Sequence, residues 1–178
     1  GALHQRVRAG RHAAADAVMT TDTGMATIWA SRHASMGADR RLLGSYNLGS
    51  MANAMPQALG AAALDPDRQV VAWCGDGGLT MLLGDLLTIA EQGLPTKVVV
   101  FDNGRLGLVK IEQEESDLTE HGTGLDNPDL AAVARALGIH GVRVTRDVDV
   151  DDAVREAFAH PGPVLLDVLV DPEATAED

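Results

Sequence analysis

The sequence predicts an α/β fold: a doubly wound parallel sheet with helices on both faces. Short apolar runs alternate along the chain with longer stretches in which apolar residues recur at helical spacing. Continuous apolar runs are typical of strands that are buried on both sides. Strands that alternate with helices indicate parallel pairing, because each helix returns the chain to the starting edge of the sheet.

Five apolar runs are predicted to be strands, and the stretches between them to be helices. The expected strands are residues 16–21 (DAVMTT), 69–74 (QVVAWC), 97–102 (KVVVFD), 141–144 (GVRV) and 164–170 (VLLDVLV). The expected helices are residues 25–33, 53–64, 80–92, 129–137 and 149–159. A long polar stretch that contains glycine, residues 112–129, is predicted to be a mobile lid.

Composition limits the function. The 178 residues, 46% of them hydrophobic, predict a single domain over residues 1–178. With 14 basic against 26 acidic residues the net charge is −12, which argues against nucleic acid or an anionic membrane surface as a partner. The single cysteine, Cys74, cannot form an internal disulfide, and no apolar run approaches the roughly 18 residues of a spanning helix. A cytoplasmic setting is therefore expected.

Three predicted strands are followed by loops that contain glycine and short polar side chains. These loops read TDTGMAT, CGDGGLT and FDNGRLGLV. Ligands of parallel sheets bind outside the carboxyl ends of the strands. The three strand ends are therefore predicted to converge on one site.

Asp76 lies in the second of these loops. Gly75, Gly77 and Gly78 let backbone amides approach a ligand, and a helix expected from about Thr80 directs its positive end to the same place. An aspartate would repel a bare phosphate, so the combination indicates a divalent cation between carboxylate and phosphate. The alternative is that Asp76 only caps the helix.

Asn103 follows Asp76 by 27 residues, at the end of the next predicted strand. Magnesium prefers oxygen ligands, which both side chains offer. Asn103 and Gly104 are also typical of an ordinary turn. The chain contains neither the glycine pattern of dinucleotide-binding folds nor that of P-loops, which leaves a magnesium-bound diphosphate as the hypothesis.

Residues 75–77 (GDG), with Asn103 at this spacing, resemble the thiamine-diphosphate-binding motif of thiamine-dependent decarboxylases and oxidases. The resemblance extends over residues 13–170. Within it, residues 40–61, 68–78 and 162–170 are most similar to the carboxyl-terminal cofactor domain of pyruvate oxidase and of the quinone-dependent pyruvate dehydrogenases of bacteria. It implies a thiamine-diphosphate-binding fold.

The resemblance also implies the site residues. The implied cofactor contacts are Gly49, Ser50, Met51, Asp76, Gly77, Gly78, Asn103, Gly104, Arg105, Leu106 and Gly107. Asp76, Asn103 and the backbone carbonyl of Arg105 are implied to bind Mg²⁺, and no side chain of this chain is implied to be catalytic. Met51 is implied to separate the two rings of the cofactor and hold it bent. Taken without the family, a methionine is typical of gap filling in a core.

Three positions depart from the family pattern. Asp102 stands where the family has a first asparagine, Leu108 where close relatives have an aromatic residue, and Leu48 where they have a histidine. The ligand position Asn103 is unaffected. Activation and electron transfer are the properties that these departures bring into question.

The resemblance implies an enzyme that oxidatively decarboxylates pyruvate, a small 2-oxo acid, and passes electrons to flavin and then to quinone or oxygen. Acetolactate synthase, a 2-oxo acid decarboxylase and a non-catalytic binding or assembly module of the same fold are the alternatives. FAD is expected in the full-length enzyme, which could be peripheral at the inner membrane, but not on this chain.

The chain is expected to be the carboxyl-terminal domain of a longer enzyme or a free subunit. In the family, a pyrimidine-binding domain or subunit supplies the glutamate that activates the cofactor, so this chain alone is expected to be inactive. A homo-oligomer is expected, because that domain comes from a neighbouring subunit.

Overall fold

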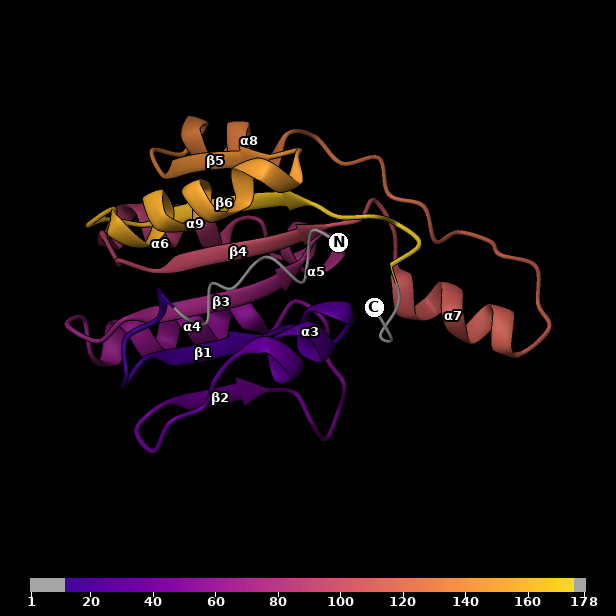
Figure 1. Ribbon diagram of the computed structural model, residues 1–178, viewed down its shortest axis with the longest axis horizontal. Coiled ribbons are helices and arrows are strands. Elements are labelled where there is room, and N and C mark those ends of the chain that lie inside the picture. The colour runs from indigo at the N-terminus through magenta and orange to yellow at the C-terminus, as the bar shows by residue number, and fades with distance from the viewer. Residues whose placement is uncertain (1–11, 175–178) are drawn as a thin grey trace.

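The computed structural model describes residues 12–174, in which six strands form one sheet (Figure 1). The strands are β1 (Val18–Thr21), β2 (Arg41–Gly44), β3 (Val70–Gly75), β4 (Lys97–Asp102), β5 (His140–Val144) and β6 (Val164–Leu169). Their order across the sheet is β2-β1-β3-β4-β6-β5, and every neighbouring pair is parallel. The predicted fold class is confirmed, but the predicted count of five strands is wrong.

Strand β2 is the one that the sequence did not predict. It lies at the edge of the sheet, where it pairs only with β1, and its residues alternate between exposed and half-buried. Its two apolar side chains, Leu42 and Leu43, are adjacent and form no longer run. A search for continuous apolar runs finds strands buried on both sides and therefore misses this one.

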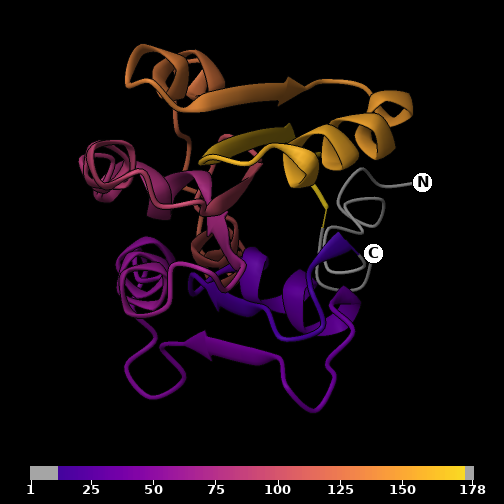
Figure 2. The ribbon, with the colours of Figure 1, turned by 90° about the vertical axis from the view of Figure 1, so that its left-hand side faces the viewer.

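Helices cover both faces of the sheet, as Figure 2 shows along the edge of the layers. They are α3 (Met25–His33), α4 (Ala54–Leu64), α5 (Asp76–Met81), α6 (Asp85–Gln92), α7 (Gly107–Glu115), α8 (Leu130–Ala136), the short 3₁₀ helix η1 (Asp147–Asp149) and α9 (Val150–Ala159). Helices α3 and α9 contribute to the apolar core on one face, through Trp29 and Val154. Helices α4, α6 and α8 contribute to the core on the other face, through Ala58, Ile89 and Leu130.

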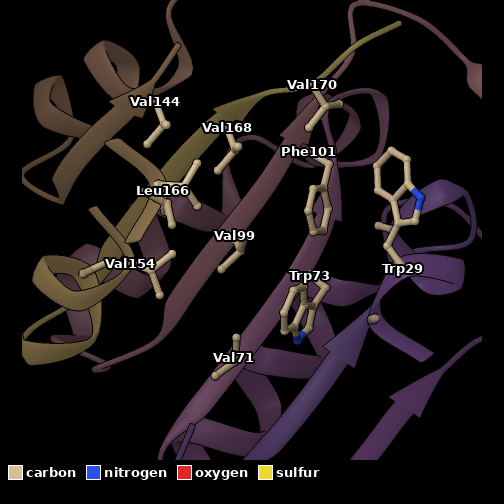
Figure 3. Packing of buried hydrophobic residues seen from close by; sticks show 14 of the residues in the cluster. Trp29, Val71, Trp73, Val99, Phe101, Val144, Val154, Leu166, Val168 and Val170 are labelled. Atoms are coloured by element: carbon tan, nitrogen blue, oxygen red, sulfur yellow. The ribbon is translucent and has the colours of Figure 1, made fainter. Parts of the chain in front are cut away.

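An aromatic cluster lies on one side of the first core, at the right of Figure 3. Trp73 of β3 stacks on Phe101 of β4, with ring centroids 5.8 Å apart. Trp29 of α3 meets Phe101 edge-on at 5.2 Å. Such pairs contribute roughly 0.5–1.5 kcal/mol beyond the burial of their area. The cluster therefore fixes α3 against the carboxyl ends of β3 and β4.

Two helices differ from the prediction. The helix expected over residues 80–92 is two helices, α5 and α6, and the first begins at Asp76 rather than near Thr80. Helix α7 was not predicted; it extends away from the sheet and fully buries no residue, and only Leu108 and Ile111 pack partly against the core, so its apolar pattern is short. Within residues 12–174, no helix is both long and apolar enough to cross a membrane.

Candidate functional site

A cavity of about 220 Å³ lies at the carboxyl ends of β1, β3 and β4. From β1 the chain goes outward to β2 on one side and then returns to β3 on the other, so the strand order reverses at this point. Parallel sheets bind ligands at such a switch point. The three predicted strand ends do meet here, and the loop after β2 joins them through Gly49 and Met51.

Most of the predicted site residues line this cavity. They are Gly49, Met51, Asp76, Gly77, Gly78, Asn103, Arg105, Leu106 and Gly107. Ser50 and Gly104 are not among the lining residues, although each is adjacent in the chain to one that is. The structure therefore brings residues from three separate loops together; their roles toward a cofactor remain predictions.

Asp76 is the first residue of α5, and its carboxylate is bonded to groups outside its own helix. Oδ2 accepts hydrogen bonds from the backbone N–H of Gly104, at 2.9 Å, and from Nδ2 of Asn127, at 2.7 Å. The residue in the capping position is Gly75, although the Asp76 carboxylate also receives a hydrogen bond from Gly77 in the first turn of α5. The side chain thus does more than cap the helix, because it also links the end of β3 to the loop after β4.

A second acid, Asp102, lies close to Asp76. Burial, with a smaller contribution from the negative charge of Asp102, raises the pKa of Asp76 to about 6, whereas hydrogen bonds from Gly77 and Asn127 act in the opposite direction. Asn127 Nδ2 also donates to Asp102 Oδ1, at 2.8 Å. Two buried carboxylates in proximity favour either a proton or a cation between them.

Asn103 and Gly104 form a tight turn at the end of β4. Asn103 Oδ1 accepts from the backbone N–H of Arg105 at 3.2 Å, and Gly104 has a left-handed φ of 65°. The turn interpretation is therefore correct for the backbone, and Asn103 is also one of the residues that line the cavity. The guanidinium of Arg105 is 2.9 Å from Glu173 Oε1, so its side chain is engaged elsewhere and its carbonyl remains the predicted ligand.

Gly77 and Gly78 lie in the first turn of α5, where a side chain would not fit. A Cβ at Gly77 would be 2.9 Å from Leu106 Cδ2 and 3.4 Å from Met51 Cε, and one at Gly78 would be 2.8 Å from the carboxyl carbon of Asp22. The backbone N–H groups of a first helical turn have no partner within their helix. The glycines therefore allow Leu106 and Asp22 to pack closely against this turn, whose backbone N–H groups are of the kind that bind anions.

The loop that carries Met51 is held by side-chain hydrogen bonds. Asn53 Nδ2 donates to the carbonyl of Ser50 at 2.9 Å and to that of Thr21 at 3.1 Å. Gly49 takes a left-handed φ of 60°, which turns the chain toward the cavity. Met51 lies in the cavity wall, outside both clusters of buried apolar residues, so the core-filling alternative does not describe it.

Sequence reasoning placed Asp22 near the site as part of the segment 21–25 (TDTGM), but it assigned no role to Glu112 or Asn127, which the structure also brings there. Asp22 lines the cavity, is 2% exposed, and binds the backbone N–H of Ala54 through Oδ1 at 2.9 Å. Glu112 of α7 also lines the cavity. Asn127 belongs to no motif, and only its position before a proline marks it as part of a turn. Its distance from Asp76 in the sequence, 51 residues, conceals the contact.

The fold and the site define a cofactor-binding domain, and comparison with known families specifies which. Residues 22–168 match the family described as "Thiamine pyrophosphate enzyme, C-terminal TPP binding domain", and the chain belongs to this family. The residues at the cavity fit magnesium-bound thiamine diphosphate, since Asp76 and Asn103 offer oxygen atoms and the first turn of α5, with Gly77 and Gly78, lines the cavity with backbone N–H groups that suit an anion.

Individual relatives are similar to nearly the whole chain. A protein of Bacillus subtilis (strain 168) described as a thiamine pyrophosphate-containing protein, YdaP, is 37% identical over 89% of this chain and 28% of its own length. Acetolactate synthase isozyme 2 large subunit of Escherichia coli (strain K12) is 37% identical over 88% of this chain and 29% of its own. Acetolactate synthase large subunit of Parasynechococcus marenigrum (strain WH8102) is 38% identical, over 90% and 26%.

These comparisons bear on the expected branch of the family. The chain spans between a quarter and a third of the length of these relatives. Two of them are named acetolactate synthase large subunits, so they support that alternative better than the pyruvate oxidase branch.

Proposed function

We propose that this chain binds thiamine diphosphate through Mg²⁺ as the diphosphate half-site of an enzyme that acts on a small 2-oxo acid. The observation that carries the proposal is the convergence of Asp76, Asn103 and Met51, from three separate loops, on one cavity of a thiamine pyrophosphate-binding domain. Thiamine diphosphate supplies the carbon nucleophile for such reactions, and the protein supplies binding and orientation.

The residues would divide the work as follows. Asp76 and Asn103 would give side-chain oxygens to Mg²⁺, and Arg105 its backbone carbonyl. The amides of Gly77 and Gly78, with the loop Gly104–Gly107, would hold the diphosphate. The segment Gly49–Met51 would contact the pyrimidine end, and the Met51 side chain, which reaches toward Gly77, would hold the cofactor bent.

For the reaction, we propose acetolactate synthesis, the joining of two 2-oxo acids with loss of carbon dioxide. The support is that relatives similar over about nine tenths of the chain are named acetolactate synthase large subunits. Oxidative decarboxylation of pyruvate, with electrons passing to flavin and then to quinone or oxygen, is the second candidate. The similarity of residues 40–61 to pyruvate oxidase favours it.

A partner domain or subunit would supply the activating glutamate, and a homo-oligomer would bring it to the site. Two acids of this chain at the cavity, Asp22 and Asp76, do not suit that role, because their carboxylates are already bonded to backbone or amide N–H groups. Tyr46 and Leu48, in the loop before Met51, are 65% and 86% exposed, which supports coverage of this side by another apolar surface.

Two assays test the proposal on the protein that carries this chain. Incubation with pyruvate, thiamine diphosphate and Mg²⁺ should yield acetolactate and carbon dioxide without any electron acceptor. Carbon dioxide release that requires quinone or oxygen would identify the oxidase instead. Glu112 is an acid of this chain that lines the cavity. If Glu112→Gln abolishes all activity, the activating acid belongs to this chain and not to the partner. We also propose that the full-length enzyme binds FAD, outside this chain, and that it is located in the cytoplasm.

A further inference from the structure

Residues 123–127 pack against the loop that follows β4. The backbone N–H of Leu106 donates to the carbonyl of Thr123, and that of Leu125 to the carbonyl of Gly104, each at 2.8 Å. Between these two bonds, the only isolated bridge in the described part of the chain pairs the two segments in antiparallel fashion. The segment lies within the stretch predicted to be a mobile lid, yet it is bonded directly to the predicted diphosphate loop.

Asn127 ends this segment and contacts two acids at once. Its Nδ2 is 2.7 Å from Asp76 Oδ2 and 2.8 Å from Asp102 Oδ1. The oxygens of an ionised carboxylate only accept hydrogen bonds, whereas an amide NH₂ group has two hydrogens to donate. The nitrogen of Asn127 is therefore the amide atom that suits this position, and it offers one hydrogen to each carboxylate.

The contact also selects between the two oxygens of Asp76. Gly104 N and Asn127 Nδ2 both bind Oδ2, at 2.9 and 2.7 Å, and neither binds Oδ1. Oδ1 is therefore the oxygen that these donors leave for a cation. Partners that orient metal ligands in this way are part of the metal site, and losing one typically lowers metal affinity by about 10- to 100-fold.

We propose that Asn127 is a positioning residue of the metal site: it fixes the rotation of the Asp76 carboxylate and, by donating to both acids, offsets the repulsion between Asp76 and Asp102. The inference rests on the proposed binding of thiamine diphosphate through Mg²⁺ and deepens it. It assigns the 123–127 segment a role in metal affinity, beyond its pairing with the loop that follows β4.

The test compares Asn127→Ala with Asp126→Ala, an exposed neighbour in the same segment. The Mg²⁺ concentration that gives half-maximal binding of thiamine diphosphate is measured by calorimetry on the protein that carries this chain. Asn127→Ala should raise it by about 10- to 100-fold. Asp126→Ala should change it by less than about twofold, as surface substitutions usually do. Asn127→Ser, which keeps one donor, should fall between and serves if the alanine variant does not fold.

A double-mutant cycle separates positioning from packing. Asp102→Asn removes the like charge. In the Asn127→Ala background it should therefore lower the Mg²⁺ concentration needed for half-maximal binding by about twofold or more, a coupling expected only between interacting residues. If Asn127 has only a structural role, Asn127→Ala will lower the unfolding temperature but leave the Mg²⁺ requirement of the folded protein unchanged. That result would overturn the inference. Wild-type protein that binds no thiamine diphosphate would overturn the proposed function and this inference together.

Discussion

Asp76 and Asp167 are two buried aspartates on the same sheet, and burial raises the pKa of each to about 6. Asp76 follows β3 and lines the cavity, where loops from several strands meet. Asp167 lies within β6, its side chain 0% exposed, and its ion-pair partner is Arg143, 3.3 Å from Oδ2. The nearby charge of Asp102 contributes to both shifts.

The comparison shows what distinguishes an acid at a candidate binding site from an acid that is buried within a strand. Both carboxylates lose water, so a raised pKa alone does not separate them. Only Asp76 lies at the carboxyl end of a strand, beside glycines that admit a ligand and opposite Asn103. Position in the fold, together with the groups that converge there, assigns the function.

The largest expected effect separates these two acids directly. Asp76→Ala should weaken Mg²⁺-dependent binding of thiamine diphosphate by more than about 100-fold, because loss of even an outer partner of a metal ligand costs about 10- to 100-fold. Asp167→Asn should leave the affinity unchanged, since Asp167 is not part of the cavity. Calorimetric titration of both variants measures this. Equal losses of thiamine diphosphate affinity in the two would show that the two acids do not differ in function.

A second test concerns the close backbone approach at the cavity. Gly78→Ala should lower the free energy of unfolding by about 1–3 kcal/mol, because its Cβ would collide with the Asp22 carboxylate. Gly84, just before α6, has open space around the corresponding position and serves as the control. Gly84→Ala should change stability by no more than about 1 kcal/mol, in the stabilising direction. Urea denaturation measures both; equal effects would mean that the site tolerates side chains.

Asp167 should reveal itself in the pH dependence of stability. Its raised pKa means that the folded state holds a proton, between the unfolded value of 3.8 and about 6, that the unfolded state has released. The carboxyl therefore contributes stability below pH 3.8 that is lost as the pH rises through about 6. From pH 4 to 8 the wild type should lose roughly 2 kcal/mol relative to Asp167→Asn. If the free energy of unfolding of the two proteins changes with pH in the same way, the pKa of Asp167 is not raised in the folded state.

The smallest expected effect concerns cofactor geometry. Met51→Ala should lower kcat on the order of tenfold, because orientation contributes to the rate, while the Kd for thiamine diphosphate changes by less than about threefold. Met81, which is 56% exposed at the end of α5, is a methionine outside the cavity, and Met81→Ala controls for loss of the side chain. A change in Kd with unchanged kcat would make Met51 a packing residue.

Sequence reasoning succeeded where burial or chemistry left a local pattern. The strands at 69–74 and 97–102 were predictable because both sides are buried and the apolar runs are continuous. Asp76 was predictable because glycines surround it, and its convergence with Asn103 follows from the parallel sheet.

The remainder depends on tertiary contacts that leave no local pattern. Strand β2 pairs on one side only, and α7 fully buries no residue, so each carries too few apolar residues for a clear pattern. Asn127 is 51 residues from Asp76, and only the folded chain brings the two together. The early start of α5 was missed because glycine, a poor helix former, occupies its first turn.

The most direct test of the account is the position of the metal. Mn²⁺ prefers the same oxygen ligands as Mg²⁺ and can be located by its anomalous X-ray scattering in crystals of the protein with thiamine diphosphate. The account predicts a single peak about 2.0–2.3 Å from side-chain oxygens of Asp76 and Asn103 and from the carbonyl oxygen of Arg105. A peak elsewhere, or bound cofactor with no metal contact to Asp76, would contradict it.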